Sequence, residues 1–484
     1  MSYIHHLVGV RIGEYHGAKS RQEFLAMPAP RTNPPGPRGL PFLGTSYMAR
    51  RDPMATLTRW AQQFGDIVYY RFFGLTIYLL VNPQHIEQVL VGKTGNLGKG
   101  LFARMNSELF GNGLLTSDGD FWRRQRRLSS PAFHRQSIDR YAEITVEEAV
   151  RTLAGWRQGD THDIHDDMMN VTLLVVLRSL FGGELGEQTR VIEQTLDVIM
   201  RGSSGIHVVT RYLRIPTLTR SRYLRAVRQL DTVVFELIAR GRKKIKEHAG
   251  GGVKDLLTLL LLARDDDGGM MTDQQLRDEV ITLLLAGHET TALTLTWTWY
   301  LLAQHPAVEK RLHEELDAAL CGRLPTAGDL AKLPYADKVI HEALRLYPPA
   351  WRIGRTSGEP LEVGGYVLPA GANILISQWV THRDERWFPN PESFNPDRWG
   401  AESIAKLPRL AYFPFGGGPR VCIGAGFAMM EATLLLAVIA QRFRMRLVPG
   451  QRIVPLPSIT LRPKNGIRVE LEERTATRTA ASAR

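Results

Sequence analysis

One long helical run in the middle of the chain constrains the fold more than any other feature. Thr272 to Gln275 has the capping-box pattern of a helix start, in which the threonine and the glutamine three residues later satisfy free backbone N–H groups. The helical pattern can continue to His305, before Pro306, over about 33 residues or roughly 50 Å. A helix of this length must be surrounded by many other elements, so we predict that it forms the centre of one large domain.

The middle of this helix carries polar residues. Val280 to Leu302 is long enough to cross a membrane, but it contains His288, Glu289 and many threonines, so we predict a buried helix with a polar centre. Gly287 can loosen the helical hydrogen-bond ladder beside a threonine hydroxyl, which makes 286–291 a polar notch. The pattern alone leaves two interpretations open: a functional notch, or a kink whose polar groups are satisfied within the helix.

The rest of the chain is mainly α with a small β-rich region. The helical period dominates from about Asp120 to Leu346, with breaks at 201–222 and 264–269. It returns at 425–443, after a region of short strands and loops that follows Pro348.

The N-terminal part is expected to contain one helix, one hairpin and one loop. The helix covers about 53–64, and the hairpin pairs 67–72 with 75–81 across a turn at Gly74. Residues 101–115 are apolar but punctuated by glycine, so we expect a loop that lines a pocket.

We predict a single domain over 34–471. The chain has 484 residues, yet no Pro/Gly/Ser linker or change of composition divides its middle. Residues 1–33 form an unpatterned N-terminal extension without a transmembrane helix or a secretory segment, and 472–484 is expected to be a disordered tail. With only two cysteines, Cys321 and Cys422, a disulfide framework is excluded, and we expect a cytoplasmic protein.

The net charge limits the choice of partners. The formal charge of +12 comes from scattered arginines without an aromatic-interleaved basic repeat, so nucleic acid is not an expected partner and an acidic protein is. The stretch 201–228 alternates basic and apolar residues, as a lid would if it touched a membrane surface or attracted an acidic substrate. We therefore expect no integral membrane anchor, although peripheral membrane contact is compatible with this pattern.

The segment Phe415 to Gly424 places Cys422 behind three glycines and just before the predicted last helix. The positive end of the helix dipole should favour a thiolate there, which suits a nucleophile or an iron ligand. The glycines let the backbone approach a flat cofactor, and Arg420 can reach an anionic group on it, so haem is favoured. The alternative is that Cys422 is only a small buried apolar residue.

The pattern Phe415-x-x-Gly418-x-Arg420-x-Cys422-x-Gly424 resembles the haem-ligand signature of the cytochrome P450 haem-thiolate monooxygenases. Further motifs follow the family's order, and the resemblance covers about 34–471: Trp122/Arg126, Ala286 to Thr291, Glu342/Arg345 and Asn390 to Trp399. The resemblance implies the P450 fold, with haem between the long central helix and the cysteine loop.

The resemblance also implies roles for individual residues. Cys422 would be the axial ligand of the haem iron, Thr290 would hydrogen-bond iron-bound dioxygen or water, and Glu289 would feed protons inward. Residues that would contact the haem, including the propionate ligands, are Trp122, Arg126, Arg355, Arg420, Phe415, Gly418, Gly424, Ala286 and Gly287. Arg352 competes with Arg355 for the propionate role.

A structural network is implied for Glu342, Arg345 and Arg398, which would hold the cysteine loop in place. Trp399 stands where the family more usually has phenylalanine, and we expect this departure to matter little.

The implied reaction inserts one atom of O2 into a C–H or C=C bond of an apolar substrate, such as a fatty acid, a terpenoid or another secondary metabolite. Haem b is the implied cofactor, and NAD(P)H would supply electrons through a separate reductase and a soluble ferredoxin or flavodoxin. Arg123, Arg124 and Arg127 either dock this acidic donor or form a solvated face. The predicted substrate-pocket positions are all apolar or small: Leu109, Phe110, Leu285, Ala286, Ala350, Trp351 and Ile459.

Two other functions remain open at this point. The chain could be a haem-thiolate isomerase or peroxygenase that needs no electron donor, or a non-catalytic haem sensor of small gases. Glu289 and Thr290 speak against the first, because proton delivery to dioxygen is what such a pair would serve.

Overall fold

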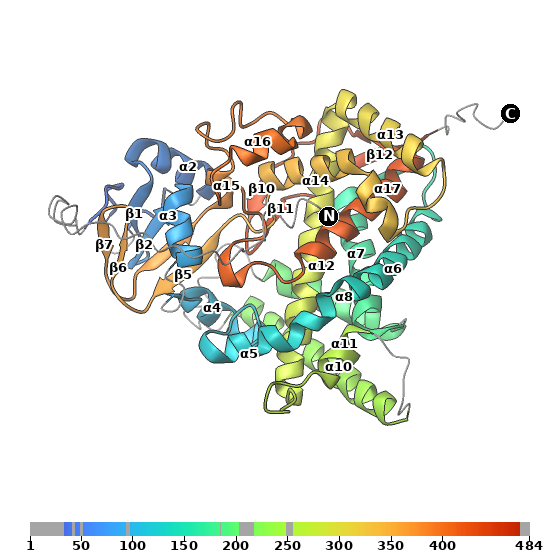
Figure 1. Ribbon diagram of the computed structural model, residues 1–484, viewed down its shortest axis with the longest axis horizontal. Coiled ribbons are helices and arrows are strands. Elements are labelled where there is room, and N and C mark those ends of the chain that lie inside the picture. The colour runs from blue at the N-terminus through green and yellow to red at the C-terminus, as the bar shows by residue number, and fades with distance from the viewer. Residues whose placement is uncertain are drawn as a thin grey trace.

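The computed structural model describes residues 33–40, 44–48, 52–92, 97–183, 185–202, 217–247 and 255–474. Helix α12 (Asp273–Gln304) crosses the middle of the molecule, and the other helices surround it (Figure 1). It begins at the predicted capping box, with both reciprocal hydrogen bonds between Thr272 and Gln275 present. The predicted extension 1–33 lies outside the described residues except for Asn33.

The helices have the following bounds: α2 (Pro53–Phe64), α3 (Pro83–Glu87), α4 (Gly100–Phe110), α5 (Gly119–Ser129), α6 (Arg135–Leu153), α7 (Ile164–Phe181), α8 (Glu187–Arg201), α10 (Leu218–Glu247), α11 (Leu256–Leu262), α13 (Pro306–Leu320), α14 (Pro334–Leu346), α15 (Gln378–Thr381), α16 (Ala401–Ala405) and α17 (Ala425–Arg442). Short helical turns include η2 (Gln88–Gly92), η6 (Pro396–Trp399) and η7 (Gly418–Arg420). The mainly helical fold predicted from the sequence is confirmed.

A five-stranded sheet forms the larger part of the β region, on the same side of the molecule as α2 (Figure 1). Its strand order is β1 (Ile67–Phe72), β2 (Leu75–Leu80), β8 (Asn373–Ile376), β5 (Ile353–Ser357) and β3 (Leu97–Gly98). The predicted hairpin is β1 and β2, which pair antiparallel with Tyr69 opposite Tyr78. Strand β8 then joins β2 in parallel, so chain segments from both ends of the sequence share one sheet.

Three smaller sheets complete the β region. In one, β12 (Arg468–Glu473) lies between β4 (Thr161–Asp163) and β9 (Phe443–Leu447). The other two pair β10 (Pro455–Pro457) with β11 (Leu461–Pro463) and β6 (Leu361–Val363) with β7 (Tyr366–Leu368).

Three local predictions were wrong. Residues 101–115 do not form a loop throughout: 100–110 is helix α4, rich in good helix formers, and the chain turns only at Gly111, whose φ is 53°. The break expected at 201–222 ends by Leu218, where α10 begins, and 203–216 lies outside the described residues.

The third error concerns the tail expected at 472–484. Strand β12 continues to Glu473, and Arg474 donates two hydrogen bonds to the carboxylate of Asp317, at 3.0 and 2.8 Å. Residues 475–484 lie outside the described residues.

The core joins α12 to the β region through aromatic residues. The ring of Trp297 on α12 stacks on Tyr347 at 4.3 Å between centroids, and its Nε1 donates to the carbonyl of Leu461 at 2.9 Å. Trp297 and Leu461 are fully buried and Tyr347 is half-buried, so β11 is held to α12 by a buried hydrogen bond from a tryptophan whose ring is itself fixed by packing.

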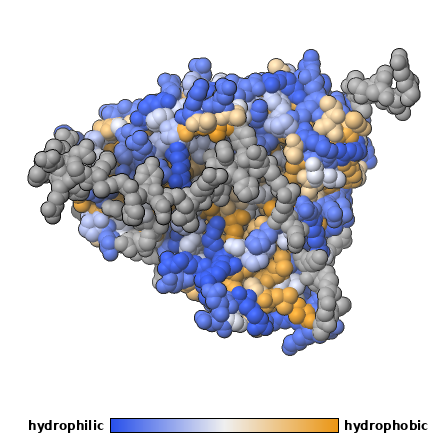
Figure 2. Space-filling model, in the orientation of Figure 1, coloured by the Kyte–Doolittle hydropathy of each residue, from blue (hydrophilic) through white to orange (hydrophobic). Residues whose placement is uncertain are grey.

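Hydrophilic residues cover most of the face shown in Figure 2, while hydrophobic residues gather low on that face, over α8 and α10. Exposed apolar side chains on these elements include Val198 and Phe235, and Leu218 at the start of α10 is 81% exposed. Among the described residues, α17 is the one helix long and apolar enough to cross a membrane. Since 72% of it is buried inside the protein, it has the burial of a core helix and is weak evidence for a span.

A buried carboxyl group ties α12 to the chain after α4. Glu279 accepts hydrogen bonds from the backbone N of Leu114 at 3.1 Å and from Nε2 of Gln125 on α5 at 3.1 Å. Burial raises the pKa of Glu279 from 4.5 to about 7, against the effect of these two donors. The carboxyl group is therefore protonated in the folded protein at pH values where the unfolded chain has already ionised it.

This raised pKa predicts a pH-dependent loss of stability. Below pH 4.5 both states hold the proton; as the pH rises from 4.5 to about 7 only the folded state keeps it, and stability falls. We expect the free energy of unfolding of the wild type, relative to Glu279→Gln, to fall by about 3 kcal/mol over this range. Urea unfolding at several pH values measures it. Glu193→Gln on exposed α8 is the control, and an equal pH dependence for both variants would contradict the assignment.

Candidate active site

The cysteine loop is closed by its own backbone. The N–H of Cys422 donates to the carbonyl of Phe415 at 2.9 Å, and that of Gly416 donates to Phe413 at 2.9 Å. Gly418 has a φ of 68°, and a Cβ there would lie 1.8 Å from the carbonyl oxygen of Leu90 in η2. The requirement for glycine at 418 therefore comes from close packing of the loop on η2.

The electrostatics of the Cys422 thiol differ from the sequence-based expectation. Gly424 is the N-cap of α17, and its N–H hydrogen bond and the charge of Arg126 both lower the pKa of the thiol. Burial among the surrounding atoms outweighs them and raises the pKa overall. Cys422 as a residue is nevertheless exposed. The expectation of a lowered pKa for the free thiol was therefore wrong.

Two predicted site residues on α5 lie beside Arg420. The Arg420 guanidinium carbon lies 4.2 Å from the ring centroid of Trp122, and that of Arg126 lies 5.9 Å from it. Arg420 also donates to the carbonyl of Ser117 at 3.0 Å and to the carboxylate of Asp118 at 2.6 Å. The loop before Cys422 is thus fixed against the start of α5.

Positive charge is concentrated next to this contact. Arg355 on β5 is buried, and burial, with the charge of Arg420 as the next cause, lowers its pKa to about 10. The pKa of Lys99 is held well below its usual value by burial and by the charges of Arg355 and Arg420. Asp118 is the acidic group that opposes these effects, and it already binds Arg420. Such an excess of desolvated positive charge suits an anionic group.

Sequence reasoning missed Lys99 and left Arg355 and Arg352 unresolved. Lys99 lies between β3 and α4, and its backbone N–H donates to Asp118 at 2.9 Å; no motif in the sequence marks it. Arg352 lies over the ring of Trp351 at 4.5 Å and is exposed. The structure therefore groups Arg355 with Arg420.

The polar notch of α12 has one accessible face. Ala286 is exposed and Gly287 and Thr290 are half-buried, whereas Leu285, His288, Glu289 and Thr291 are buried. Ala286 and Thr290 are four residues apart and so lie on one side of the helix, and the hydroxyl of Thr290 donates to the carbonyl of Ala286 at 2.7 Å.

The two neighbours of Thr290 in the notch face other elements. Oε1 of Glu289 accepts hydrogen bonds from Oγ1 of Thr460 and from Nε of Arg462, both at 2.5 Å. His288 binds the carbonyl of Met169 on α7 through Nε2 at 2.9 Å, and burial lowers its pKa to about 4. His288 thus has a structural contact with α7.

The structure brings Glu342, Arg345 and Arg398 together. Glu342 and Arg345 on α14 are fully buried, and the carboxylate accepts from both Nε and Nη2 of the guanidinium at 2.9 Å. Nε of Arg398 on η6 donates to the same carboxylate at 3.1 Å. Trp399 adds a hydrogen bond from its Nε1 at 3.1 Å, so the indole contributes a contact that phenylalanine lacks.

A chain of contacts connects this network to the cysteine loop. Nη1 of Arg345 donates to the carbonyl of His382 at 2.9 Å, and Nε2 of His382 accepts from the N–H of Phe413 at 3.0 Å. Burial and the charge of Arg345 hold the pKa of His382 far below its usual value, so the ring stays neutral and can accept this bond. Phe413 in turn binds Gly416.

Known proteins with similar sequences decide the family. The family model described as Cytochrome P450 matches residues 34–471 of this chain. The chain belongs to the cytochrome P450 family. The cyclooctatin synthase of Streptomyces melanosporofaciens is 40% identical over 88% of this chain and 92% of its own length.

Other P450s extend the comparison to activity and fold. The cyclooctat-9-en-7-ol 5-monooxygenase of the same organism is 37% identical over 87% of this chain and 91% of its own length. Pentalenene oxygenase of Streptomyces avermitilis is 34% identical over 91% of this chain and 97% of its own length. The structure of a cyanobacterial P450 with bound retinoic acid superposes with a TM-score of 0.83 at 27% identity, covering 92% of this chain and 100% of that one. The protein is a P450 monooxygenase, of a family that uses haem iron and O2.

The predicted pocket positions of this P450 fall into separate groups. Leu109 and Phe110 end α4, which packs on α12, and Leu285 lies on α12; all three are buried in the main core. Ala350 is half-buried and so is Ile459, in the turn between β10 and β11. Trp351 is buried in the apolar cluster of α2 and β1, and its Nε1 donates to the carbonyl of Ser458 at 3.0 Å. This bond places the ring of Trp351 beside the turn that carries Ile459, in a different apolar cluster from Leu109, Phe110 and Leu285.

The arginines on the exposed side of α5 are paired within the P450 itself. Arg124 binds Asp265 at 2.6 Å, Arg127 binds Asp266 and Arg123 binds Asp120. These charges are compensated by the loop before α12 and by α5, so the idea that they are free to dock an acidic electron donor loses its support.

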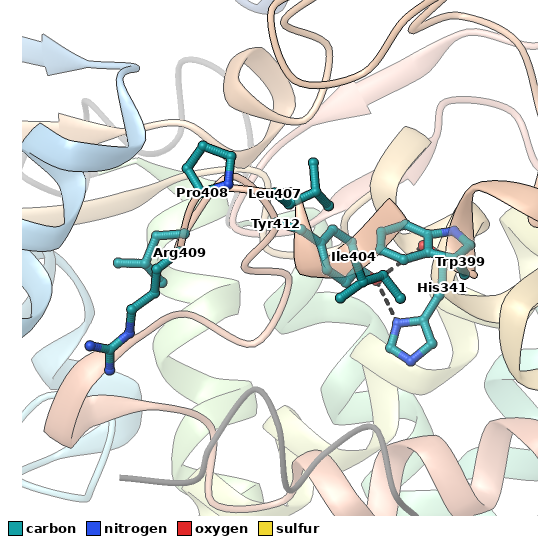
Figure 3. Close-up of a pocket in the computed structure, with 8 residues that line it drawn as sticks. His341, Trp399, Ile404, Leu407, Pro408, Arg409 and Tyr412 are labelled. Carbon is teal, nitrogen blue, oxygen red and sulfur yellow. Dashed lines mark hydrogen bonds between the residues drawn. The ribbon is translucent and has the colours of Figure 1, made fainter. Parts of the chain in front are cut away.

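A small cavity lies beside the Glu342 network, at Trp399. It has a volume of about 60 Å³ and is lined by residues that include His341, Trp399 and Tyr412 (Figure 3). Nδ1 of His341 and the hydroxyl of Tyr412 are 2.9 Å apart, and that hydroxyl donates to the carbonyl of His341 at 3.0 Å. Its lining includes neither Cys422 nor residues of the α12 notch.

The contact between Trp399 and Glu342 predicts a specific loss of stability. Trp399→Phe removes one hydrogen bond to a buried carboxylate, and we expect the free energy of unfolding to fall by about 2 kcal/mol. Urea unfolding of the holoenzyme measures it. Trp387→Phe is the matched control, because Nε1 of Trp387 is buried without a hydrogen-bond partner. Equal losses in the two variants would contradict a role for the indole hydrogen bond. They would support the earlier expectation that the change from phenylalanine to tryptophan at position 399 matters little.

Proposed function

We propose that this P450 uses a haem b bound by Cys422 to oxygenate an apolar cyclic terpenoid, with electrons from a separate protein. The observation that carries the proposal is the position of Cys422, exposed at the end of a closed loop and beside a cluster of cations in which Arg355 is buried and Arg126, Arg420 and Lys99 are half-buried. The similarity to P450s named for oxygenating pentalenene and cyclooctat-9-en-7-ol supports the choice of substrate class.

The residues present fit a haem. The thiol of Cys422 would ligate the iron, and Arg126, Arg355, Arg420 and Lys99 would bind the negatively charged propionates. Asp118, which pairs with Arg420, is the acidic group already beside them. Trp122 would support Arg420 through its ring, and Phe415, Gly418 and Gly424 would shape the loop. When bound, the haem supplies the iron centre at which O2 is activated.

The accessible face of α12 would provide the polar groups on the side of the haem where O2 binds. Ala286 and Gly287 leave space beside Thr290, whose hydroxyl can give up its bond to the Ala286 carbonyl and donate to a ligand instead. Glu289 would supply the protons that reduction of O2 requires, after its carboxyl group leaves the contacts with Thr460 and Arg462.

The pocket positions favour an apolar substrate. Leu109, Phe110, Leu285, Ala286, Ala350 and Ile459 carry no charge, so they offer apolar contact and no ion pair to a ligand. A terpenoid hydrocarbon or alcohol suits such a lining better than a fatty acid, whose carboxylate needs a partner.

The electron source is proposed to be a soluble ferredoxin or flavodoxin with its NAD(P)H-dependent reductase in the cytoplasm. Two cysteines are too few for an iron–sulfur cluster, which supports a separate electron carrier. A peroxygenase or isomerase would need neither this carrier nor the acid at position 289. The exposed side chain of Leu218 at the start of α10 supports peripheral contact with an apolar surface.

Turnover with labelled oxygen tests the proposed function. The holoenzyme, with a ferredoxin, its reductase and NADPH, is given pentalenene or a fatty acid of similar size under ¹⁸O2. We expect the terpenoid product to gain one ¹⁸O atom by mass spectrometry, and Thr290→Ala to lower its yield about 100-fold while peroxide accumulates. Thr298→Ala on α12 is the control, because the Thr298 hydroxyl makes the same kind of bond within the helix, to the carbonyl of Thr294 at 2.7 Å. Faster turnover with peroxide than with reductase would contradict the proposal.

A further inference from the structure

Arg352, just before β5, has no carboxylate partner among the residues that the structure describes. Its guanidinium carbon lies 4.5 Å from the centroid of the Trp351 ring. The charges that act on Arg355, three residues later, come from Arg420 and Asp118, whereas the titratable neighbour of Arg352 is Tyr70. The two arginines therefore belong to different parts of the protein interior, and Arg352 is left without an assigned role.

Arg352 lies in a hollow of the protein. The residue is exposed, yet burial among protein atoms lowers the pKa of its guanidinium, an effect that Tyr70 opposes. A side chain that solvent reaches, although protein atoms surround it, lies in a concave place rather than on a convex surface. Cys422 in the candidate active site combines the same two properties, since it is exposed and burial raises its pKa.

The residue before Arg352 is held firmly on both sides. The carbonyl of Trp351 accepts hydrogen bonds from Oγ of Ser377 at 3.2 Å and from the N–H of Trp379 at 3.3 Å. Its ring is fixed by the bond from Nε1 to the carbonyl of Ser458 at 3.0 Å. A guanidinium that rests on a fixed ring is already oriented and loses little further freedom when it binds a ligand.

Two of the predicted substrate-pocket positions adjoin this fixed tryptophan. Ala350 precedes Trp351 in the chain, and Ile459 follows the residue that accepts the indole hydrogen bond. Both are half-buried and uncharged. The cation of Arg352 is therefore placed at one end of a lining that is otherwise apolar.

Tyr70 on β1 adds a second hydrogen-bond donor near Arg352. Its ring belongs to the same apolar cluster as Trp351 and packs on Trp60 at 5.0 Å between centroids. Burial raises the pKa of Tyr70, so the hydroxyl keeps its proton. This hydroxyl forms no hydrogen bond with another described residue, and Arg352 is close enough for their charges to interact. A guanidinium and a hydroxyl that both lack an acceptor form a site for an oxygen anion.

We propose that Arg352, together with the Tyr70 hydroxyl, determines specificity by binding a carboxylate group at one end of a terpenoid substrate. A carboxylate compensates the cation and accepts two parallel hydrogen bonds from the guanidinium, whereas a hydroxyl group compensates no charge. Arg352 is thus the partner for a carboxylate that the apolar pocket positions lack, while those positions contact the hydrocarbon skeleton. This inference rests on the proposed function, because it specifies which terpenoids the same site prefers.

Optical titration of the ferric holoenzyme with abietic acid, abietinol and abietadiene tests the assignment. These diterpenoids share one skeleton and differ in carrying a carboxylate, a hydroxyl or a methyl group at one carbon. We expect the wild type to bind the acid about tenfold more tightly than the hydrocarbon or better. Arg352→Gln should weaken binding of the acid about 10- to 100-fold and change binding of the hydrocarbon less than about twofold.

The matched control is Arg71→Gln on β1. It removes an exposed positive charge one position after Tyr70, where the side chain points to the opposite face of the strand, and it should leave all three affinities unchanged. Arg352→Lys keeps the charge and should recover part of the affinity for the acid. Tyr70→Phe should weaken binding of the acid about threefold, and it serves if Arg352→Gln does not fold.

Two results would overturn the proposal. One is equal affinity of the wild type for acid and hydrocarbon, and the other is an equal loss for all three ligands in Arg352→Gln. Binding requires no electron donor, so the titration is independent of oxygenation. If the acid binds through Arg352 but no terpenoid gains ¹⁸O, the proposed function fails and the carboxylate site stands. If terpenoids gain ¹⁸O but Arg352→Gln binds the acid as the wild type does, the site is refuted and the function stands.

Discussion

The buried carboxylate of Glu342 is the contact on which the cysteine side of this protein depends. Its oxygens accept from Arg345 on its own helix, from Arg398 and Trp399 on η6 and from the backbone of Asn395. A buried charge that loses its partners is strongly unfavourable, so these segments cannot separate one at a time. Through His382 and Phe413 the same network reaches the loop of Cys422, which is how a charge pair on α14 can fix the place of a sulfur atom.

Local sequence rules predicted the elements whose signals are local. The capping box of α12, the hairpin of β1 and β2 and the helix after Cys422 follow from residues only a few positions apart. Helix α4 was missed because its glycines at both ends suggested a loop, although the residues between them favour a helix. The pKa of Cys422 was misjudged because the helix end is a local effect, whereas desolvation depends on everything that packs around the sulfur.

The resemblance to P450s named candidate residues that physical rules alone would not have selected, but it did not provide their partners. Arg462 lies 173 residues from Glu289, and no spacing rule connects them. Lys99 was identified as a site residue only from the structure, which places it close to Arg355 and Arg420, away from solvent. In each case the missing information was the contact between distant segments, which depends on how α12 and the sheet pack together.

The absorbance spectrum of the reduced, carbon-monoxide-bound protein tests the central claim most directly, namely that Cys422 is the ligand of a haem iron. We expect the red-shifted Soret band of thiolate-ligated haem in the wild type and in Cys321→Ser, whose cysteine is exposed at the end of α13. Cys422→Ser should lack it. A spectrum like that of histidine-ligated haem in the wild type, or the same red-shifted band in Cys422→Ser, would contradict the account.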